Sequence, residues 1–199
     1  MKVQKTVGIL AFHGDVVEHM RATQRAAENL AKDVNVISIT TKGDLQRLHA
    51  LIIPGGESTT LYKLSVREGM WEDMKKIPHI FGTCAGAIML ATEIRHKIAG
   101  QQSLERMDMT IDRNAYGRQT DSFEKEISTA LGTFAAIFIR APKILRTGKN
   151  VRILAKNGLE IIACEEETPR GYSLAACFHP EFSTTRFHEY FLKKLFGVS

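Results

Sequence analysis

Residues 79–94, HIFGTCAGAIMLATEI, decide the fold. The apolar residues of His79–Gly82 predict a short buried strand, and the run over Ala85–Ile94 predicts a helix. Only Thr83 and Cys84 lie between the two, so the chain turns sharply from strand to helix. A strand that leads directly into a helix is the repeating unit of a parallel sheet covered by helices.

The same alternation extends toward the N-terminus. Further strands are expected at Thr6–Phe12, Val34–Ile39 and Ala50–Ile53, and further helices at Val16–Lys32, Thr59–Arg67 and Trp71–Lys76. In the first of these helices the spacing of Val17, Met20, Ala27 and Leu30 indicates an apolar face. Strands and helices that alternate in this way predict a parallel sheet with helices on both faces.

The second half of the chain is richer in strands. They are expected at Met107–Asp112, Ala136–Ile139, Val151–Ala155, Leu159–Cys164 and Tyr172–Phe178, and a closing helix at about Thr184–Phe196. The turn sequence Lys156-Asn157-Gly158 joins two of these strands as a hairpin. We therefore predict an α/β fold whose open, mainly parallel sheet carries an antiparallel extension, in a single domain over residues 1–199.

Composition excludes several classes of function. The chain has 199 residues, 44% hydrophobic and 25% charged, with a net charge of +5. Its 27 basic residues are spread without a basic arm or an aromatic platform, which argues against nucleic-acid binding. The absence of any long apolar run argues against a membrane span. The start of the chain is typical of a first strand rather than a signal peptide, so a cytoplasmic location is expected.

Three cysteines stand at positions 84, 164 and 177. The odd number and wide spacing predict neither a disulfide framework nor a zinc site. Cys84 stands in the pattern G-x-C-x-G between a strand and a helix, the cysteine form of a nucleophile elbow. The start of the helix favours the thiolate, and the N–H of Ala85 is placed to bind an oxyanion. Cys164 and Cys177 lie inside apolar strands and are expected to be small buried side chains.

A cysteine nucleophile needs a base, and the base needs a group to orient it. His179 directly follows the strand Tyr172–Phe178, where open α/β sheets keep their active sites. Glu181 stands two residues later, after Pro180, and can hold the imidazole in one tautomer. The other histidines considered, His19, His49, His96 and His188, lie in or beside polar, helix-like segments and are expected to be solvated.

The loop Pro54-Gly55-Gly56-Glu57-Ser58 follows another strand. The N–H groups of Gly55 and Gly56 can bind an anion or an oxyanion. A phosphate loop is excluded because the G-x-x-x-x-G-K-[ST] pattern is missing and Glu57 would repel phosphate. Two interpretations stay open: an oxyanion loop whose acid meets a substrate ammonium, and a tight turn in which Ser58 caps the next helix.

Six segments together resemble one known family. They are Gly55-Gly56-Glu57-Ser58-Thr59-Thr60, Gly82-Thr83-Cys84-Ala85-Gly86, Arg113-Asn114-Ala115-Tyr116-Gly117-Arg118-Gln119, Asp121-Ser122-Phe123-Glu124, Phe138-Ile139-Arg140-Ala141-Pro142 and Phe178-His179-Pro180-Glu181. The chain resembles the class I glutamine amidotransferases, and within them the glutaminase subunits of pyridoxal 5′-phosphate synthase, the PdxT family. The resemblance covers nearly the whole chain and implies a three-layer sheet with a flavodoxin-like core.

The resemblance also implies an activity, partners and site residues. The expected reaction is hydrolysis of L-glutamine to glutamate and ammonia by a triad of Cys84, His179 and Glu181. The ammonia would pass through a tunnel to a synthase subunit in a hetero-oligomer that makes pyridoxal phosphate (vitamin B6). No metal or cofactor is expected. The positions that would contact glutamine are Gly56, Glu57, Ser58, Arg113, Ile139 and Arg140. Arg140 lies in an apolar run, so we expect it to be the arginine least like a solvated surface charge.

The chain departs from the family in two places. The family usually has Leu-Gln-Gly-Asp after its first strand, and this chain has Phe12-His13-Gly14-Asp15. Because that loop lies near the oxyanion region and the synthase interface in relatives, His13 bears on activation but not on the triad. The stretch between Ile127 and Ala136 is also short for the family.

Two other functions were weighed. A stress-response hydrolase or chaperone with an elbow cysteine would place its histidine soon after the cysteine, where this chain offers only His96. A regulatory module that only binds the synthase would have no need of Cys84. The H-P-E segment at Glu181 favours the glutaminase over both.

Overall fold

The computed structural model describes residues 4–114 and 122–198. The first half contains β1 (Lys5–Leu10), α1 (Val16–Asn29), β2 (Val34–Ile39), α2 (Lys42–Leu45), β3 (Ala50–Ile53), α3 (Ser58–Arg67), α4 (Trp71–Met74), β4 (His79–Thr83), α5 (Ala85–Leu90) and β5 (Ala91–Arg95). The second half contains β6 (Met107–Asp112), β7 (Phe123–Thr129), β8 (Gly132–Phe138), β9 (Lys143–Thr147), β10 (Arg152–Asn157), β11 (Glu160–Thr168), β12 (Gly171–Ala176), the short 3₁₀ turn η1 (Pro180–Phe182) and α6 (Arg186–Phe196).

The main sheet has the strand order β2-β1-β3-β4-β12-β11-β9-β6-β5, and β10 pairs with β11. The strands from β2 to β12 run parallel. From β12 onward the pairs β12–β11, β11–β9 and β9–β6 are antiparallel. β7 and β8 form a separate hairpin. The predicted fold class, a mainly parallel α/β sheet with an antiparallel extension, is confirmed.

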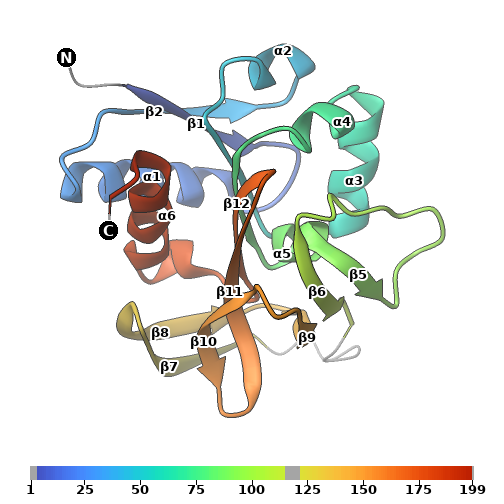
Figure 1. Ribbon diagram of the computed structural model, residues 1–199, viewed down its shortest axis with the longest axis vertical. Helices are drawn as coiled ribbons and strands as arrows, with labels where there is room; N and C mark the ends of the chain where they lie inside the picture. Colours follow the sequence, from blue (N-terminus) through green and yellow to red (C-terminus); the bar gives the residue numbers. More distant parts are fainter. Residues whose placement is uncertain (1–3, 115–121, 199) are drawn as a thin grey trace.

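The inner parallel strands β1, β3, β4 and β12 are buried on both faces, as their continuous apolar sequences predict, whereas the edge strand β2 is partly exposed. In β3, Ala50 and Ile52 pack into the core that includes residues of α1 and α6. The alternate residues Leu51 and Ile53 pack into the core beneath α3, α4 and α5. Figure 1 shows α1 and α6 side by side on one side of the sheet and α3, α4 and α5 on the other.

The apolar face predicted for α1 is confirmed except at Val17, which is 51% exposed. Ala27 is buried, and Met20 and Leu30 pack against the core. The buried residues of the helix are His19, Ala22, Thr23, Ala26 and Ala27, which also follow a helical period. The small side chains among them let α1 lie close to the sheet.

Several elements from α5 onward were predicted only in part. The helix expected over Ala85–Ile94 ends at Leu90, and the next five residues form β5, which pairs in parallel with β6. That pairing depends on residues more than ten positions away, which a local apolar run cannot reveal. Strands β7 and β9 were not predicted. The hairpin at Asn157-Gly158 is confirmed, with Gly158 in the left-handed region at φ +61°.

The topology brings four loops to one edge of the sheet. Strands β1, β3, β4 and β12 are neighbours and parallel, so their carboxyl ends meet. The loops after them carry Asp15, Gly55, Cys84 and His179. Ligands and catalytic groups in open α/β sheets collect at such an edge. Among the described residues, no helix is long and apolar enough to span a membrane.

Candidate active site

Cys84 occupies the sharp turn between β4 and α5 that the sequence predicts. Its backbone has φ +48° and ψ −105°, a conformation that side chains rarely adopt, and its N–H donates to the carbonyl of Ala176 at 2.8 Å. The flanking glycines are required by close packing. A Cβ on Gly82 would lie 2.4 Å from the backbone of Gly86, and a Cβ on Gly86 would lie 2.0 Å from the carbonyl oxygen of Ile53. The pattern G-x-C-x-G therefore follows from how tightly helix α5 lies on the sheet.

The three cysteines differ in their surroundings. The Cys84 thiol donates to the carbonyl oxygen of Ile139 at 3.7 Å. Burial raises the pKa of Cys164 to about 12, and burial also raises the pKa of Cys177 well above its usual value. Those two thiols stay protonated at neutral pH and are poor nucleophiles. Their predicted place inside buried strands is confirmed.

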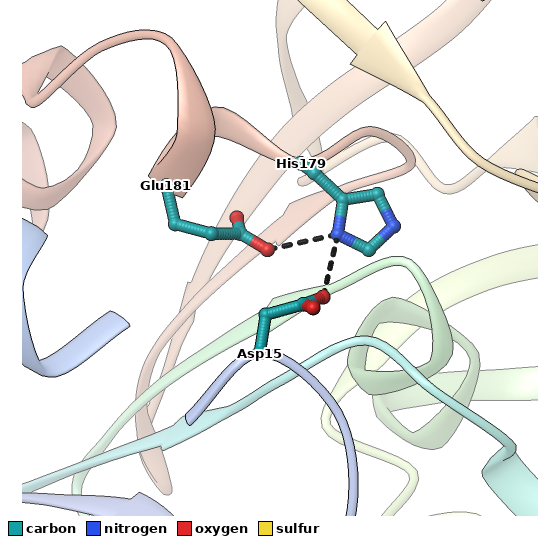
Figure 2. Close-up of side chains that lie close together, drawn as sticks. All are labelled: Asp15, His179 and Glu181. Carbon is teal, nitrogen blue, oxygen red and sulfur yellow. Dashed lines mark hydrogen bonds and ion pairs between the residues drawn. The ribbon is translucent and has the colours of Figure 1, made fainter. Parts of the chain in front are cut away.

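His179 and Glu181 form the pair expected from the H-P-E segment. His179 follows β12, and its Nδ1 lies 2.8 Å from Oε1 of Glu181 (Figure 2). Glu181 lies on the turn η1, and its side chain is fully buried. Within the described part of the chain, the buried Nε2 of His179 has no hydrogen-bond partner. The acid thus holds one ring nitrogen and leaves the other free for a proton transfer.

The protonated form of His179 is stabilised. Burial alone would lower the pKa of His179, but its bonds to Asp15 and Glu181 and the nearby Cys84 sulfur outweigh burial and raise that pKa to about 12. Burial likewise opposes the charge on Glu181, yet His19 and His179 lower the pKa of Glu181 well below its usual value. An imidazolium beside Cys84 is the partner that stabilises a thiolate.

Asp15 is a site residue that the sequence reasoning missed. Its Oδ2 lies 3.2 Å from Nδ1 of His179, the same ring nitrogen that Glu181 contacts (Figure 2). It follows β1 at the same sheet edge as His179, so the rule that singled out the histidine could also have found this acid. The atoms of Asp15, His179 and Glu181 lie within 4.8 Å of one another, close enough to hold a metal ion. In this arrangement the carboxylates of Asp15 and Glu181 both contact the His179 imidazole, which suits two acids that orient that ring.

Two histidines expected to be solvated are buried behind Glu181. His19 and His188 have no exposed surface, so that expectation is wrong. His19 lies on the buried face of α1 and His188 on the buried face of α6, and the two helices pack together. His96, by contrast, is exposed and pairs with Asp112 at 2.8 Å. His96 forms this pair at the surface, away from Cys84. The structure therefore gives no support to the alternative in which the catalytic histidine follows soon after the cysteine in the sequence.

The loop after β3 lies directly against His179. A Cβ on Gly55 would come within 2.4 Å of Cε1 of His179, and a Cβ on Gly56, where φ is +115°, would come within 2.3 Å of Nδ1 of His13. The loop after β1 touches the same segment, because a Cβ on Gly14 would lie 2.1 Å from the carbonyl oxygen of Gly55. Backbone in these two loops can therefore approach a substrate closely only because glycine stands at these positions.

Glu57, rather than Ser58, is the N-cap of α3, so the cap expected at Ser58 is wrong. Oε1 of Glu57 accepts from the Thr59 N–H and from Arg113 Nη2, and Oε2 accepts from the N–H and the hydroxyl of Thr60. These bonds occupy the four acceptor sites of a carboxylate, which leaves none for a substrate ammonium. Burial opposes the charge on Glu57, but the bonds from Thr59 and Thr60 lower its pKa to about 2.

Arg113 is fixed by the same cluster. Its Nη1 donates to Thr59 Oγ1 and to Gln101 Oε1, both at 2.9 Å, beside the 2.8 Å ion pair with Glu57. Gln101, almost fully buried, also donates to Ser58 Oγ at 3.0 Å. Sequence reasoning gave no signal for Gln101, because it stands in a segment without periodicity. The structure thus gathers Glu57, Ser58 and Arg113 in one network.

The two remaining positions expected to contact glutamine, Ile139 and Arg140, differ in their surroundings. The carbonyl of Ile139 lies beside Cys84, whereas Arg140 is exposed, with φ +46°, so the expectation that it is unlike a surface charge is wrong. The segment Ala115–Asp121, which carries most of one motif and the start of another, lies outside the described residues.

Comparisons with known proteins agree on one family. The profile of the SNO glutamine amidotransferase family matches residues 9–196. A pyridoxal 5′-phosphate synthase subunit PdxT from Thermococcus kodakarensis is 42% identical over 196 residues, covering 94% of this chain and 98% of the relative. The protein of the same description from Methanosarcina acetivorans is 41% identical, covering 95% and 98%. A solved structure described as a glutamine amidotransferase is 39% identical, with a TM-score of 0.81, and the match covers 96% of this chain and 99% of that one.

Proposed function

Because this chain belongs to the SNO glutamine amidotransferase family, we propose that it is the glutaminase subunit of a pyridoxal 5′-phosphate synthase. In this proposal the whole chain is one glutaminase domain in the cytoplasm. It hydrolyses L-glutamine with Cys84, His179 and Glu181 and passes the ammonia to a synthase subunit. The observation that supports the triad most is His179, held at Nδ1 by Glu181 while its buried Nε2 has no partner among the described residues.

The proposed reaction has two halves. The Cys84 thiolate attacks the side-chain amide carbon of glutamine, and His179 protonates the departing ammonia. A water molecule that gives its proton to His179 then hydrolyses the glutamyl thioester, which releases glutamate and restores the thiolate. Glu181 keeps the imidazole in the productive tautomer throughout. No step needs a metal or a cofactor.

The tetrahedral intermediates carry an oxyanion that needs donors. We assign this role to the backbone N–H groups of Gly55, Gly56 and Ala85. Gly55 lies against His179, and Ala85 is the first residue of α5, next to the nucleophile. Each such donor is worth about 3 kcal/mol in related acyl transfers.

The glutamine pocket is proposed to be lined by Gly56, Glu57, Ser58, Arg113, Ile139 and Arg140. The network around Glu57 changes the role that we give to this acid. Since its oxygens are taken by α3 and Arg113, it acts by holding Arg113 in place rather than by meeting the ammonium. Within the part of the chain that the structure describes, Arg113 keeps unused N–H groups with which it can bind the substrate carboxylate.

A direct assay tests the function. The purified protein is incubated with L-glutamine, with and without the synthase subunit of the same organism, and ammonia and glutamate are measured. We expect equal amounts of both products and a higher kcat with the synthase, because an uncoupled glutaminase would waste glutamine. No ammonia under either condition would reject the proposal, and equal turnover with and without the synthase would reject the coupling.

His13 is the residue whose change we expect to affect the stimulation by the synthase. Its ring lies against the backbone of Gly56, and the loop that carries it also touches Gly55. We expect His13→Ala to change the stimulation by the synthase more than it changes KM for glutamine. The ratio of kcat with synthase to kcat without it is the measurement, and a ratio equal to that of the unchanged protein would contradict this role.

Changing Glu57 to glutamine is expected to weaken glutamine binding. The ion pair to Arg113 is lost, and a loss of about 1.4 kcal/mol in binding would raise KM about tenfold while kcat stays nearly unchanged.

The lowered pKa of Glu57 also means that this carboxylate stabilises the fold fully above about pH 4.5 and loses that effect as the pH falls toward 2. Steady-state kinetics check the first expectation, and unfolding at several pH values checks the second. A drop in kcat alone would contradict the assignment.

A further inference from the structure

Behind the triad acid lies a second set of buried polar groups that the proposed reaction does not use. Nε2 of His19 lies 3.3 Å from Oε1 of Glu181 and 3.0 Å from Oγ1 of Thr83. Nδ1 of His19 lies 3.0 Å from Nε2 of His188. His19, Thr83 and His188 have no exposed surface, so water does not reach them. They come from three elements, α1, β4 and α6.

We propose that His19 is a positioning residue for the triad: its protonated Nε2, which also faces Thr83 at 3.0 Å, lies 3.3 Å from Oε1 of Glu181 and holds the carboxylate that orients His179. This inference rests on the proposed function, since it assigns a partner to the acid of that triad. It acts through Glu181 and does not touch the substrate.

The orientation of Glu181 needs more than its bond to His179. The last torsion of a glutamate side chain is broad and has two nearly equivalent positions. A single bond from His179 would let the carboxylate swing and offer either oxygen. His19 reaches the same oxygen, Oε1, from α1, while the buried Oε2 has no partner among the residues that the structure describes. Two donors on one oxygen define a single position of the acid.

The tautomer of His19 follows from its other neighbour. Burial lowers the pKa of His188 to about 3, so this ring is neutral and carries one proton. Its Nδ1 is buried and has no partner in the described part of the chain, whereas its Nε2 faces His19. A buried N–H without an acceptor is costly, so the proton belongs on Nε2, where it is donated to Nδ1 of His19. His19 then carries its own proton on Nε2, the atom that faces Glu181 and Thr83.

A core histidine without this role would fit the structure less well. An apolar side chain at position 19 would pack against Phe81 but would leave Glu181 with a single donor for a carboxylate that has no exposed surface. His19 also reaches Thr83, the residue before Cys84, so it connects the acid and the nucleophile elbow through one ring. The position of His19 therefore affects the distance between Glu181 and the elbow that carries Cys84.

Nuclear magnetic resonance of protein with ¹⁵N-labelled histidine tests the proposal without any turnover. We expect a slowly exchanging Nε2 proton and a bare Nδ1 on His19, and a shift of the His179 Nδ1 proton signal in the His19→Leu variant. A proton on Nδ1 of His19, or a His179 signal that does not move, would overturn the proposal even if the protein proved to be a glutaminase.

Kinetics supply the second test, with variants chosen to separate positioning from packing. His19→Leu removes the donor, and His19→Gln keeps an amide N–H near the place of Nε2. Thr23→Val is the matched control: Thr23 is equally buried on α1 and bonds to the carbonyl of His19 but does not touch the triad. We expect kcat to fall about 10- to 100-fold in His19→Leu, as for other partners that orient functional groups, with KM unchanged.

The same series decides between the two roles. His19→Gln should recover most of kcat, and Thr23→Val should keep it within twofold even if both variants unfold at a lower temperature. In the Glu181→Gln background, His19→Leu should cause no further loss, because the acid that it positions is gone. Equal loss in His19→Leu and His19→Gln, or an additive loss in the double variant, would show that the ring only fills space.

Discussion

Replacement of Cys84 by alanine is expected to abolish glutamine hydrolysis and to leave the fold intact. The thiol is the only group at the elbow that can form the thioester, and without it the reaction has no covalent route. Residual ammonia release should be lower by about 10³-fold or more, the range seen when a triad nucleophile is removed. The measurement is ammonia release under saturating glutamine, together with circular dichroism to confirm the fold.

The other cysteines supply the control for this variant. Cys164→Ala and Cys177→Ala remove equally buried thiols whose raised pKa keeps them unreactive. Both should keep their activity, and an electrophilic glutamine analogue should modify Cys84 alone. Modification of either strand cysteine, or full activity in Cys84→Ala, would reject the nucleophile.

The second large effect is expected at Glu181. Glu181→Gln keeps the size of the side chain but offers an amide to His179, which favours the wrong tautomer. Turnover should fall by about 10⁴, as for the same acid-to-amide change in a serine triad, while KM changes little. The loss of a buried charge between two histidines also alters stability, so the free energy of unfolding is measured beside kcat.

Glu166→Gln is the matched control for that variant. Glu166 is also a buried glutamate, and its carboxylate accepts the N–H of Asp108; Glu166 pairs with Ser173 near the start of β12, the opposite end of that strand from His179. Its change should affect stability and leave kcat near the starting value. A rise in KM without a fall in kcat for Glu181→Gln would mean that this acid binds substrate instead.

The residues with local signatures could be predicted from the sequence. The glycines around Cys84 and the strand before His179 are short-range patterns, and both residues lie where those patterns place them. That the strands of the first half run parallel also follows from the alternation of strands and helices. By contrast, the change from helix to strand at Ala91 depends on pairing with β6, which no local pattern contains.

The buried histidines show a different limit. His19 and His188 stand among polar residues, so their sequence context predicts exposure. What buries them is the packing of α1 on α6 and a carboxylate that arrives from a segment 162 residues away, at Glu181. The place of Gln101 in the site could not be predicted from the sequence for the same reason, since its partners Ser58 and Arg113 belong to separate segments.

The place of β12 in the sheet has a consequence for biosynthesis. β12 is the last strand to leave the ribosome, yet it lies between β4 and β11 in the middle of the sheet. A nascent or truncated chain that stops before Gly171 therefore exposes two open strand edges, which invite pairing with other chains. It also lacks His179, which directly follows β12. Translation must therefore be nearly finished before the proposed site can be complete.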